Sequence, residues 1–317
     1  MEITFVDAAT LGDDIDLSPF EQFGKLNIYK NCSPENLPER IKNSDIIVTN
    51  KVRFNGGVLK YAKKLKIICL AATGYDPVDI NYCREHSIAV CNVVGYSTDS
   101  VAQITVSMAL ELINRMREYT GFTASGEYSK SGLPNRVSPC YHEISGKVWG
   151  IVGLGNIGKK VAAVASALGC RVICCKNTPE KGYDCVDIDT LIESSDIISL
   201  HVPLTENTRN LINKERITKM KKGVILINAA RGAVTDEKAI ADSVISGHIG
   251  GFGCDVYSVE PFGEDHPFYK IKDYCSVCLT PHMAWAAYEA RVRCMDEIIL
   301  NIKAFFNGEI RNRVELI

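Results

Sequence analysis

Short apolar runs alternate with helical patterns along the whole chain, in two successive series. The first series holds ITFVDA, LNIY, DIIVTN, LKIICLAA and IAVCNV, and the second holds VWGIVG, RVICC, DIISLHV, GVILINAA, GGFGCDV and VCLT. Segments such as PENLPERIKN and NIGKKVAAVASALG lie between the runs. Strands that alternate with helices pair in parallel through crossover connections. The pattern therefore predicts an α/β protein with two doubly wound parallel sheets.

The order of the two series predicts the domain organisation. A chain of 317 residues is long for one α/β core and suits two domains. The last apolar segment, which begins at Ala284, is again helical, and we expect it to return to the first domain. We therefore predict that a domain at 100–287 is inserted in a domain formed by 1–99 and 288–317.

A long amphipathic segment opens the inserted domain. Its apolar residues fall at helical spacing, which predicts one helix from about residue 100 to 119. Ser100 and Gln103 stand at the spacing of a capping box at its start. A polar loop rich in glycine and proline follows, GEYSKSGLPNRVSPCYHE.

Composition and charge exclude several classes of function. The chain is 46% hydrophobic and 23% charged, as globular proteins are, and its net charge of -2 comes without the basic stripe that nucleic acid requires. We expect no membrane span, because no apolar run is long enough, and no signal peptide, because the N-terminus turns acidic at once. The 13 cysteines lie mostly in apolar runs, which suits reduced thiols in the cytoplasm.

One CxxC pair, Cys275 and Cys278, offers an alternative as a redox site or half of a metal site. The surrounding segment has the pattern of a strand, and residues three apart on a strand point to opposite faces. No second CxxC completes a zinc site. We therefore expect no metal site.

A glycine-rich turn follows the first strand of the second series. Gly153, Gly155 and Gly158 form G-x-G-x-x-G between the strand VWGIV and a helical segment, which is the context that dinucleotide binding requires. The first glycine allows a tight turn, the second lets the backbone approach a pyrophosphate, and the third lets helix pack on strand. The helix N-terminus then attracts phosphates. The alternative is a plain turn, but the context favours a Rossmann domain.

The acidic residue that usually follows this motif by about 20 residues is missing. The second strand, RVICC, ends instead at Lys176. A lysine cannot accept a hydrogen bond from the ribose hydroxyl, but it can attract a 2′-phosphate. The sequence therefore leaves NAD and NADP open and leans to NADP, the alternative being a solvated lysine without a ligand.

Polar residues follow three further strands of the second series. Arg231 follows GVILINAA, Asp255 and Glu260 follow GGFGC, and His282 follows VCLT. Ligands of open α/β sheets bind outside the carboxyl ends of the strands, so these residues should cluster on the rim that carries the glycine loop. An isolated histidine is usually a structural residue, but this combination favours a functional site.

Three of these residues suit hydride transfer between a hydroxy acid and a nicotinamide. An arginine holds a substrate carboxylate or polarises a keto oxygen with its planar fork, which points to Arg231. A histidine transfers the hydroxyl proton near neutral pH, which points to His282. A carboxylate beside a histidine favours the charged ring and selects its tautomer, which points to Glu260.

Over essentially its whole length the chain resembles the D-isomer-specific 2-hydroxyacid dehydrogenases. The segments GLGNIG, HVPLTENTRNLI, LINAARGAVTDEKAI, GCDVYSVEP and LTPH are similar to that family's signatures and stand in the same order. The resemblance implies a Rossmann domain inserted in a flavodoxin-like substrate domain. It also implies Arg231 as the substrate-binding arginine, His282 as the acid and base, and Glu260 as its partner. Further cofactor contacts implied by the resemblance are Thr105, Asn156, Ile157, Val202, Pro203, Thr208, Ala229, Ala230 and Asp255.

A subgroup of that family, the glycerate dehydrogenases that reduce hydroxypyruvate, is more similar still, in VTNKV, ATGYDPVD, NVVGYSTDSVAQ and PHMAWAAYEAR. The resemblance implies that the backbone at Gly74 and Tyr75 holds the substrate carboxylate and that Lys51 and Trp285 contact substrate. Where the family has an acidic residue, this chain has Lys176, which puts strict use of NAD in doubt. Such enzymes are usually homodimers, and we expect the contact at the long helix from Ser100 and its loop.

Two alternatives stay open. The substrate could be another 2-keto acid, such as pyruvate or phenylpyruvate, since the loops of the first domain set the substrate range. A protein of another class, a dinucleotide-sensing corepressor with this fold, could also carry the residues Arg231, Glu260 and His282. The absence of long disordered tails argues against the corepressor.

Overall fold

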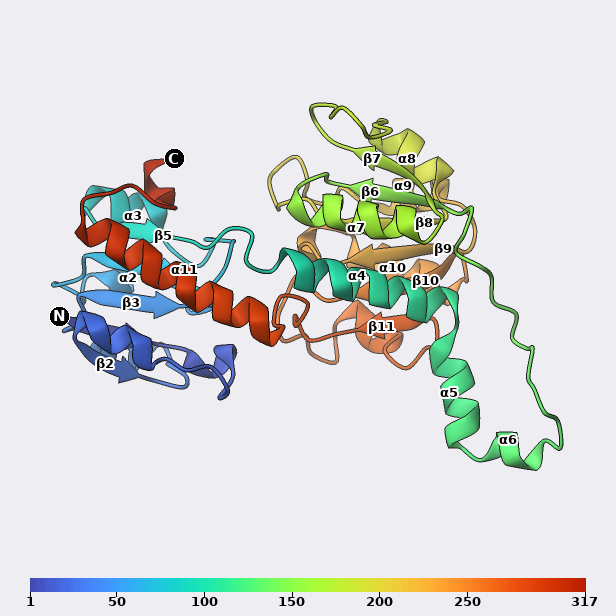
Figure 1. The fold of residues 1–317 in the computed structure, drawn as a ribbon, viewed down its shortest axis with the longest axis horizontal. Helices are drawn as coiled ribbons and strands as arrows, with labels where there is room; N and C mark the ends of the chain where they lie inside the picture. The colour runs from blue at the N-terminus through green and yellow to red at the C-terminus, as the bar shows by residue number, and fades with distance from the viewer. The chain divides into compact units, whose positions relative to one another are not determined.

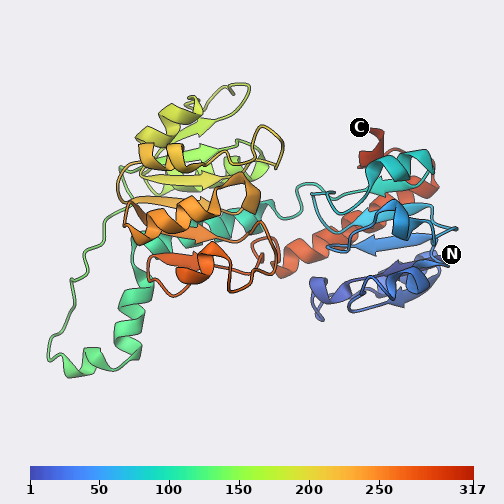
Figure 2. The same ribbon diagram turned by 180° about the vertical axis from the view of Figure 1, so that it is seen from behind.

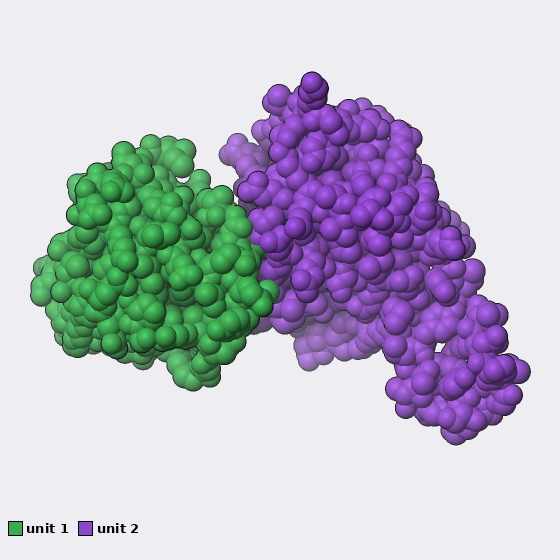
Figure 3. Space-filling view, viewed as in Figure 1, with its two compact units in different colours: residues 1–97, 286–317 green, residues 98–285 purple.

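All the neighbouring strands in the computed structural model, which describes residues 1–317, pair in parallel. The chain divides into unit 1, residues 1–97 and 286–317, and unit 2, residues 98–285 (Figure 3). The boundaries expected from the sequence lie two residues further along at both crossings, 100 against 98 and 288 against 286. The predicted fold class, two doubly wound parallel-sheet domains, is confirmed.

Unit 1 has the strand order of a flavodoxin-like sheet, β2-β1-β3-β4-β5. Its strands are β1 (Glu2–Phe5), β2 (Lys25–Ile28), β3 (Ile46–Thr49), β4 (Ile67–Leu70) and β5 (Ala89–Cys91). Its helices are η1 (Ala8–Leu11), η2 (Ser18–Phe23), α1 (Leu37–Ile41), α2 (Gly56–Leu59), α3 (Ile80–Glu85), α11 (Tyr288–Phe306) and η5 (Val314–Leu316). The last long helix, α11, returns to unit 1 and packs on β4 and β5 (Figure 1).

Unit 2 has the order β7-β6-β8-β9-β10-β11. Its strands are β6 (Val148–Val152), β7 (Arg171–Cys175), β8 (Ile197–Leu200), β9 (Val224–Asn228), β10 (Ile249–Cys254) and β11 (Val277–Leu279). A single parallel bridge from Cys174 to Cys185 extends the sheet beyond β7. If this bridge is counted as a shortened third strand, the sheet has the 3-2-1-4-5-6 order of a Rossmann domain, with one strand added. The order reverses between β6 and β8.

The helices of unit 2 cover both faces of its sheet. They are α4 (Thr98–Ile113), α5 (Met116–Ala124), α6 (Glu127–Lys130), α7 (Asn156–Ala167), α8 (Ile188–Ser194), α9 (Lys214–Lys219), η3 (Gly232–Val234), α10 (Glu237–Ile245) and η4 (Pro267–Lys270). Figure 1 shows α4 and α7 over one face, and Figure 2 shows the helices of the opposite face. No helix in either unit is both long and apolar enough to span a bilayer.

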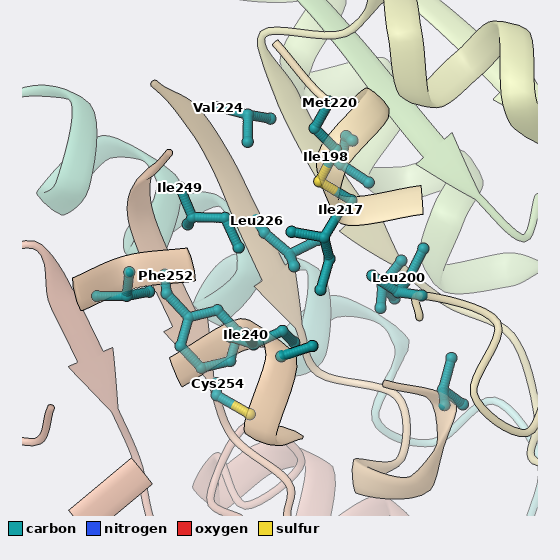
Figure 4. Close-up of a cluster of buried hydrophobic side chains, with 14 of the residues drawn as sticks. Ile198, Leu200, Ile217, Met220, Val224, Leu226, Ile240, Ile249, Phe252 and Cys254 are labelled. Carbon is teal, nitrogen blue, oxygen red and sulfur yellow. The ribbon is translucent and has the colours of Figure 1, made fainter. Parts of the chain in front are cut away.

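Alternate residues of the central strands enter two different cores. Ile198 and Leu226 join the cluster under α8, α9 and α10 (Figure 4), whereas Ile197 and Ile225 join the cluster under α4 and α7. Successive side chains of a strand point to opposite faces, so a strand covered on both sides needs a continuous apolar run. Full burial of each such side chain contributes roughly 1.5–3 kcal/mol.

The helix predicted for 100–119 is interrupted. It begins at Thr98, ends at Ile113, and resumes as α5 after Arg115, whose φ of 53° turns the backbone into the left-handed region. The capping box predicted at Ser100 is wrong, because Ser100 lies inside α4 and its hydroxyl donates to the carbonyl oxygen of Ala284. Spacing alone did not reveal the break, because Met116 continues the apolar periodicity across it.

The segment after the break forms an arm, residues 116–143, which projects from the rest of unit 2 (Figure 1). None of its residues is buried. It nevertheless exposes large apolar side chains, with Leu133 at 63%, Val137 at 80% and Tyr141 at 55% of full exposure. A segment that exposes apolar side chains without a core of its own favours contact with another surface.

A buried polar network marks the place where the order of the unit 2 sheet reverses. Ser199 on β8 accepts a hydrogen bond from Trp149 Nε1 on β6 at 3.0 Å, and its Oγ lies 3.0 Å from His201 Nε2. Burial lowers the pKa of His201 to about 4. The folded chain therefore holds this ring in its neutral form.

We expect His201 to make unit 2 less stable in mild acid. Its pKa is lower when folded, about 4 against 6.5, so the unfolded state binds the extra proton and stability falls as pH falls from 6.5 towards 4. Between pH 7 and pH 5 the loss should be about 2 kcal/mol. Urea unfolding at both pH values measures it, and His201→Gln should reduce the difference by that amount. An equal difference in both proteins would assign the acid sensitivity to other groups.

Candidate active site

The three glycines after β6 each meet a different geometric demand. Gly153 has a φ of 98°, and a Cβ there would lie 2.7 Å from the backbone of His201. A Cβ at Gly158 would lie 2.1 Å from the carbonyl oxygen of Gly153, so α7 packs directly on the turn. A Cβ at Gly155 would meet nothing within 4 Å, so protein packing does not explain this glycine. The open space over Gly155, at the start of α7, fits the pyrophosphate of a dinucleotide.

The loop after β8 lies beside this turn, because β8 pairs with β6. Within the loop, Thr208 Oγ1 donates to the carbonyl oxygen of Pro203 at 2.6 Å and accepts from the N–H of Thr205 at 2.7 Å. These bonds hold the segment that contains Val202, Pro203 and Thr208. Asn156 and Ile157 form the first turn of α7. Thr105 is buried in α4, and its hydroxyl donates to the carbonyl oxygen of Val101 in the same helix.

His282 and Glu260 form a hydrogen-bonded pair. His282 Nδ1 lies 2.7 Å from Glu260 Oε2, and the N–H of Tyr257 donates to Glu260 Oε1 at 3.0 Å. A carboxylate only accepts, so Nδ1 carries the proton and Nε2 is the ring atom that can give or take one. Trp285 Nε1 donates to the carbonyl oxygen of His282, whose φ is 52°. The histidine is thus oriented from both its ring and its backbone.

Arg231 lies three residues after the end of β9. Its Nη1 donates to the carbonyl oxygen of Ala230, and its own carbonyl oxygen accepts from Asn228 Nδ2 at 3.0 Å. The next residue, Gly232, packs so closely that a Cβ would lie 2.0 Å from the backbone of Tyr257. The loop of Arg231 therefore rests on the loop of Glu260, which in turn binds His282.

Asp255 lies beneath this cluster and is 1% exposed. One carboxylate oxygen accepts from Thr280 Oγ1 at 2.6 Å and from the N–H of Met283 at 2.8 Å, and the other accepts from the N–H of Ala284 at 3.0 Å. Its backbone N–H donates to Asn228 at the end of β9. Burial raises the pKa of Asp255, while these hydrogen bonds oppose the rise.

A second carboxylate below the site was missed from the sequence. Glu237, the first residue of α10, accepts from the N–H of Ser258 at 2.8 Å and lies 3.0 Å from His266 Nε2. His266 Nδ1 accepts from the N–H of Phe268, so Nε2 carries the proton that bonds to Glu237. This contact holds the loop two residues before Glu260. The only sequence signal was an acidic residue at a helix start, which is common.

Lys176, the residue expected to attract a 2′-phosphate, is already paired. Its Nζ lies 2.5 Å from Glu180 Oε2, and the other oxygen of Glu180 binds Lys159 Nζ. Glu180 was also missed from the sequence, because it lies five residues after the end of β7 on an irregular loop. The end of β7 therefore presents two lysines and one glutamate.

The three site candidates in unit 1 follow two strands of its sheet. Lys51 comes after β3, and its N–H donates to the buried Asp7 at 2.6 Å, a carboxylate that also accepts from the N–H of Asn50. Gly74 and Tyr75 come after β4 in a loop held by Thr73, whose hydroxyl donates to the carbonyl oxygen of Val93. Tyr75 is 42% exposed. These three residues belong to unit 1, and the other candidates belong to unit 2.

Comparison with known proteins gives a consistent result. Residues 106–284 match the family model described as D-isomer specific 2-hydroxyacid dehydrogenase, NAD binding domain. The glycerate dehydrogenase of Methylorubrum extorquens is 36% identical over 283 residues, 89% of each chain. A D-lactate dehydrogenase from Aquifex aeolicus complexed with NAD and lactic acid is 28% identical, with a TM-score of 0.85 over 98% of this chain and 96% of that one. An acyclic imino acid reductase in complex with NADPH and D-Arg is 28% identical, with a TM-score of 0.86 over 99% and 100%.

Proposed function

Because the chain belongs to the D-isomer-specific 2-hydroxyacid dehydrogenase family and is an NAD(P)-dependent oxidoreductase of small 2-hydroxy acids, we propose that it interconverts hydroxypyruvate and D-glycerate. The hydrogen-bonded pair of His282 and Glu260, beside the loop of Arg231, carries this proposal. The likeness to a glycerate dehydrogenase supports the choice of substrate.

Arg231 binds the substrate. Its planar guanidinium donates to the substrate carboxylate or to the keto oxygen, where negative charge grows during reduction. The backbone at Gly74 and Tyr75 donates to the carboxylate, and Lys51 and Trp285 contact the rest of the substrate. In this proposal these residues determine which 2-keto acid is accepted. Hydrogen bonds within unit 1 hold the loop of Lys51 and the loop of Gly74 and Tyr75.

His282 moves the proton. In reduction, carbon 2 of the keto acid receives a hydride and its oxygen receives the proton from Nε2 of the charged imidazole ring. Glu260 bonds to Nδ1 and stabilises that charged ring. In oxidation, the neutral ring takes the hydroxyl proton at Nε2. The pair of His282 and Glu260 therefore serves both directions. Reduction starts from the charged His282 ring, and oxidation starts from the neutral ring.

The cofactor-binding residues fit NAD(P). NAD(P)H supplies the hydride when bound. Gly153, Gly155 and Gly158, with Asn156 and Ile157 at the start of α7, hold the pyrophosphate. The flanking contacts that we propose are Val202, Pro203, Thr208, Ala229, Ala230, Arg231 and His282, with Thr105 and Asp255, both buried, completing the set. Lys176 favours acceptance of NADP.

We also propose a cytoplasmic location, because the cysteines of both units are free thiols, as is usual in a reducing compartment.

Steady-state oxidation of NADH and NADPH with hydroxypyruvate, pyruvate and phenylpyruvate tests the function. We expect the largest kcat/KM for hydroxypyruvate. Arg231→Lys should lower that value about 100-fold, or ~3 kcal/mol, because it removes the planar fork, while the Kd of NADH measured by fluorescence changes little. A larger kcat/KM for another acid would overturn the substrate proposal. No turnover with any of the three acids would also overturn the substrate proposal and would point to a different 2-hydroxy acid.

We expect Glu260→Gln to shift the pH profile of reduction. The wild type should lose reductive activity as pH rises, because reduction starts from charged His282. Without the anion the charged ring is less stable, so the midpoint of that loss should move to lower pH. Initial rates from pH 5 to 9 measure it. Glu264→Gln, on the same loop but exposed, is the matched control. An unmoved midpoint in Glu260→Gln would make Glu260 a structural carboxylate.

We propose that the enzyme is a homodimer joined through α4 and the arm. The exposed apolar side chains of the arm support this contact. Light scattering after gel filtration should give the mass of two 34.9 kDa chains. The double variant Leu133→Ser, Val137→Ser should weaken the dimer at least tenfold, whereas Lys130→Ser, on the same arm, should not. A wild-type mass of one chain would refute the proposal.

A further inference from the structure

Two lysines from different elements converge on one carboxylate at the end of β7. Lys159 comes from the first turns of α7, and Lys176 is the first residue after β7. Glu180 divides its two carboxylate oxygens between the two ammonium groups. The three side chains are 40%, 35% and 29% exposed, so the cluster can be reached from solvent.

The cluster lies in the part of the fold that holds the adenosine ribose of a dinucleotide. In a Rossmann domain the end of the second strand lies beside the 2′ position of the adenosine ribose, while the glycine turn after the first strand lies at the pyrophosphate. Here β7 is the second strand and α7 begins at the glycine turn. Lys159, Lys176 and Glu180 therefore lie at the end of the second strand, where a Rossmann domain holds the one position at which NAD and NADP differ.

The lysines and the glutamate of the cluster favour different cofactors. A ribose hydroxyl donates a hydrogen bond, which a carboxylate accepts and a lysine cannot. A 2′-phosphate carries about 1.5 to 2 negative charges, attracts lysines and is repelled by a carboxylate. Hydrogen bonds from Lys159 and Lys176 hold the pKa of Glu180 below its ordinary value, and Glu180 raises the pKa of Lys159. Glu180 is therefore an anion near neutral pH, and Lys159 is a cation.

We propose that Glu180 determines cofactor preference by occupying the two lysines that a 2′-phosphate needs. With NAD bound, the carboxylate stays on the lysines and accepts from the ribose hydroxyl. With NADP bound, the 2′-phosphate takes its place and bonds to Lys159 and Lys176. The residue that opposes NADP is thus not at the strand end, where Lys176 stands, but four residues further along. The inference rests on the proposed function, because it requires that unit 2 binds NAD(P).

Removal of Glu180 should favour the phosphorylated ligand. Glu180→Gln keeps the size of the side chain and its acceptor oxygen but removes the charge, so both lysines become available. Isothermal titration with adenosine 2′,5′-bisphosphate and with adenosine 5′-monophosphate measures the effect of the 2′-phosphate without turnover. We expect Glu180→Gln to tighten the bisphosphate at least tenfold relative to the monophosphate, and Lys159→Gln in the same chain to reverse most of that gain.

Asp184→Asn is the matched control, because Asp184 lies on the same loop and its removal changes the net charge equally. The Kd values of NADPH and NADH, measured by fluorescence, should change in the same direction as those of the bisphosphate and the monophosphate, respectively. The proposal is overturned if Glu180→Gln tightens the bisphosphate no more than Asp184→Asn does. That result, with NADH still bound by the wild type, leaves the proposed function intact. Failure of the wild type to bind NADH or NADPH would overturn both.

Discussion

The buried carboxylate of Asp255 joins the ends of three strands, and the arrangement of the catalytic loops depends on it. Its backbone follows β10 and donates to the last residue of β9, while its side chain accepts from Thr280, Met283 and Ala284 after β11. A buried carboxylate is costly unless hydrogen bonds replace its water. These contacts provide the replacement and hold the segment that contains His282.

Close backbone contact provides the second constraint. At Gly232 a Cβ would overlap the backbone of Tyr257, and at Gly158 it would overlap Gly153. Both glycines are needed for proximity and not for an unusual φ, since neither has a positive φ. The first contact joins the loops of Arg231 and Glu260, and the second joins α7 to the turn after β6. One close glycine contact therefore holds the catalytic end of the site, and another holds the cofactor end at the turn after β6.

The two ends use electrostatics differently. Around His282 the carboxylates of Glu260, Asp255 and Glu237 are each bonded to specific donors, two of them in buried or nearly buried positions, where such bonds are strong and directional. Around Lys176 the groups are about one third exposed, so their attraction is weaker and screened by salt. Such a cluster can exchange one anion for another at a small cost in free energy. This property suits a site that selects between cofactors, whereas a site that positions a proton needs fixed partners.

The sequence alone determined the fold class and pointed to His282, Glu260 and Arg231. The fold class follows from the periodicity of the apolar residues, and the three residues were found because they come directly after predicted strands. Apolar runs of strand length that alternate with helices allow few arrangements, and parallel strands bring their carboxyl ends to one edge. It did not reveal the break at Arg115, the partner of Ser100, or the roles of Glu180 and Glu237. Each of these depends on a contact between residues whose spacing carries no periodic signal. A backbone turn and a carboxylate shared between two elements become visible only when packing has brought the elements together.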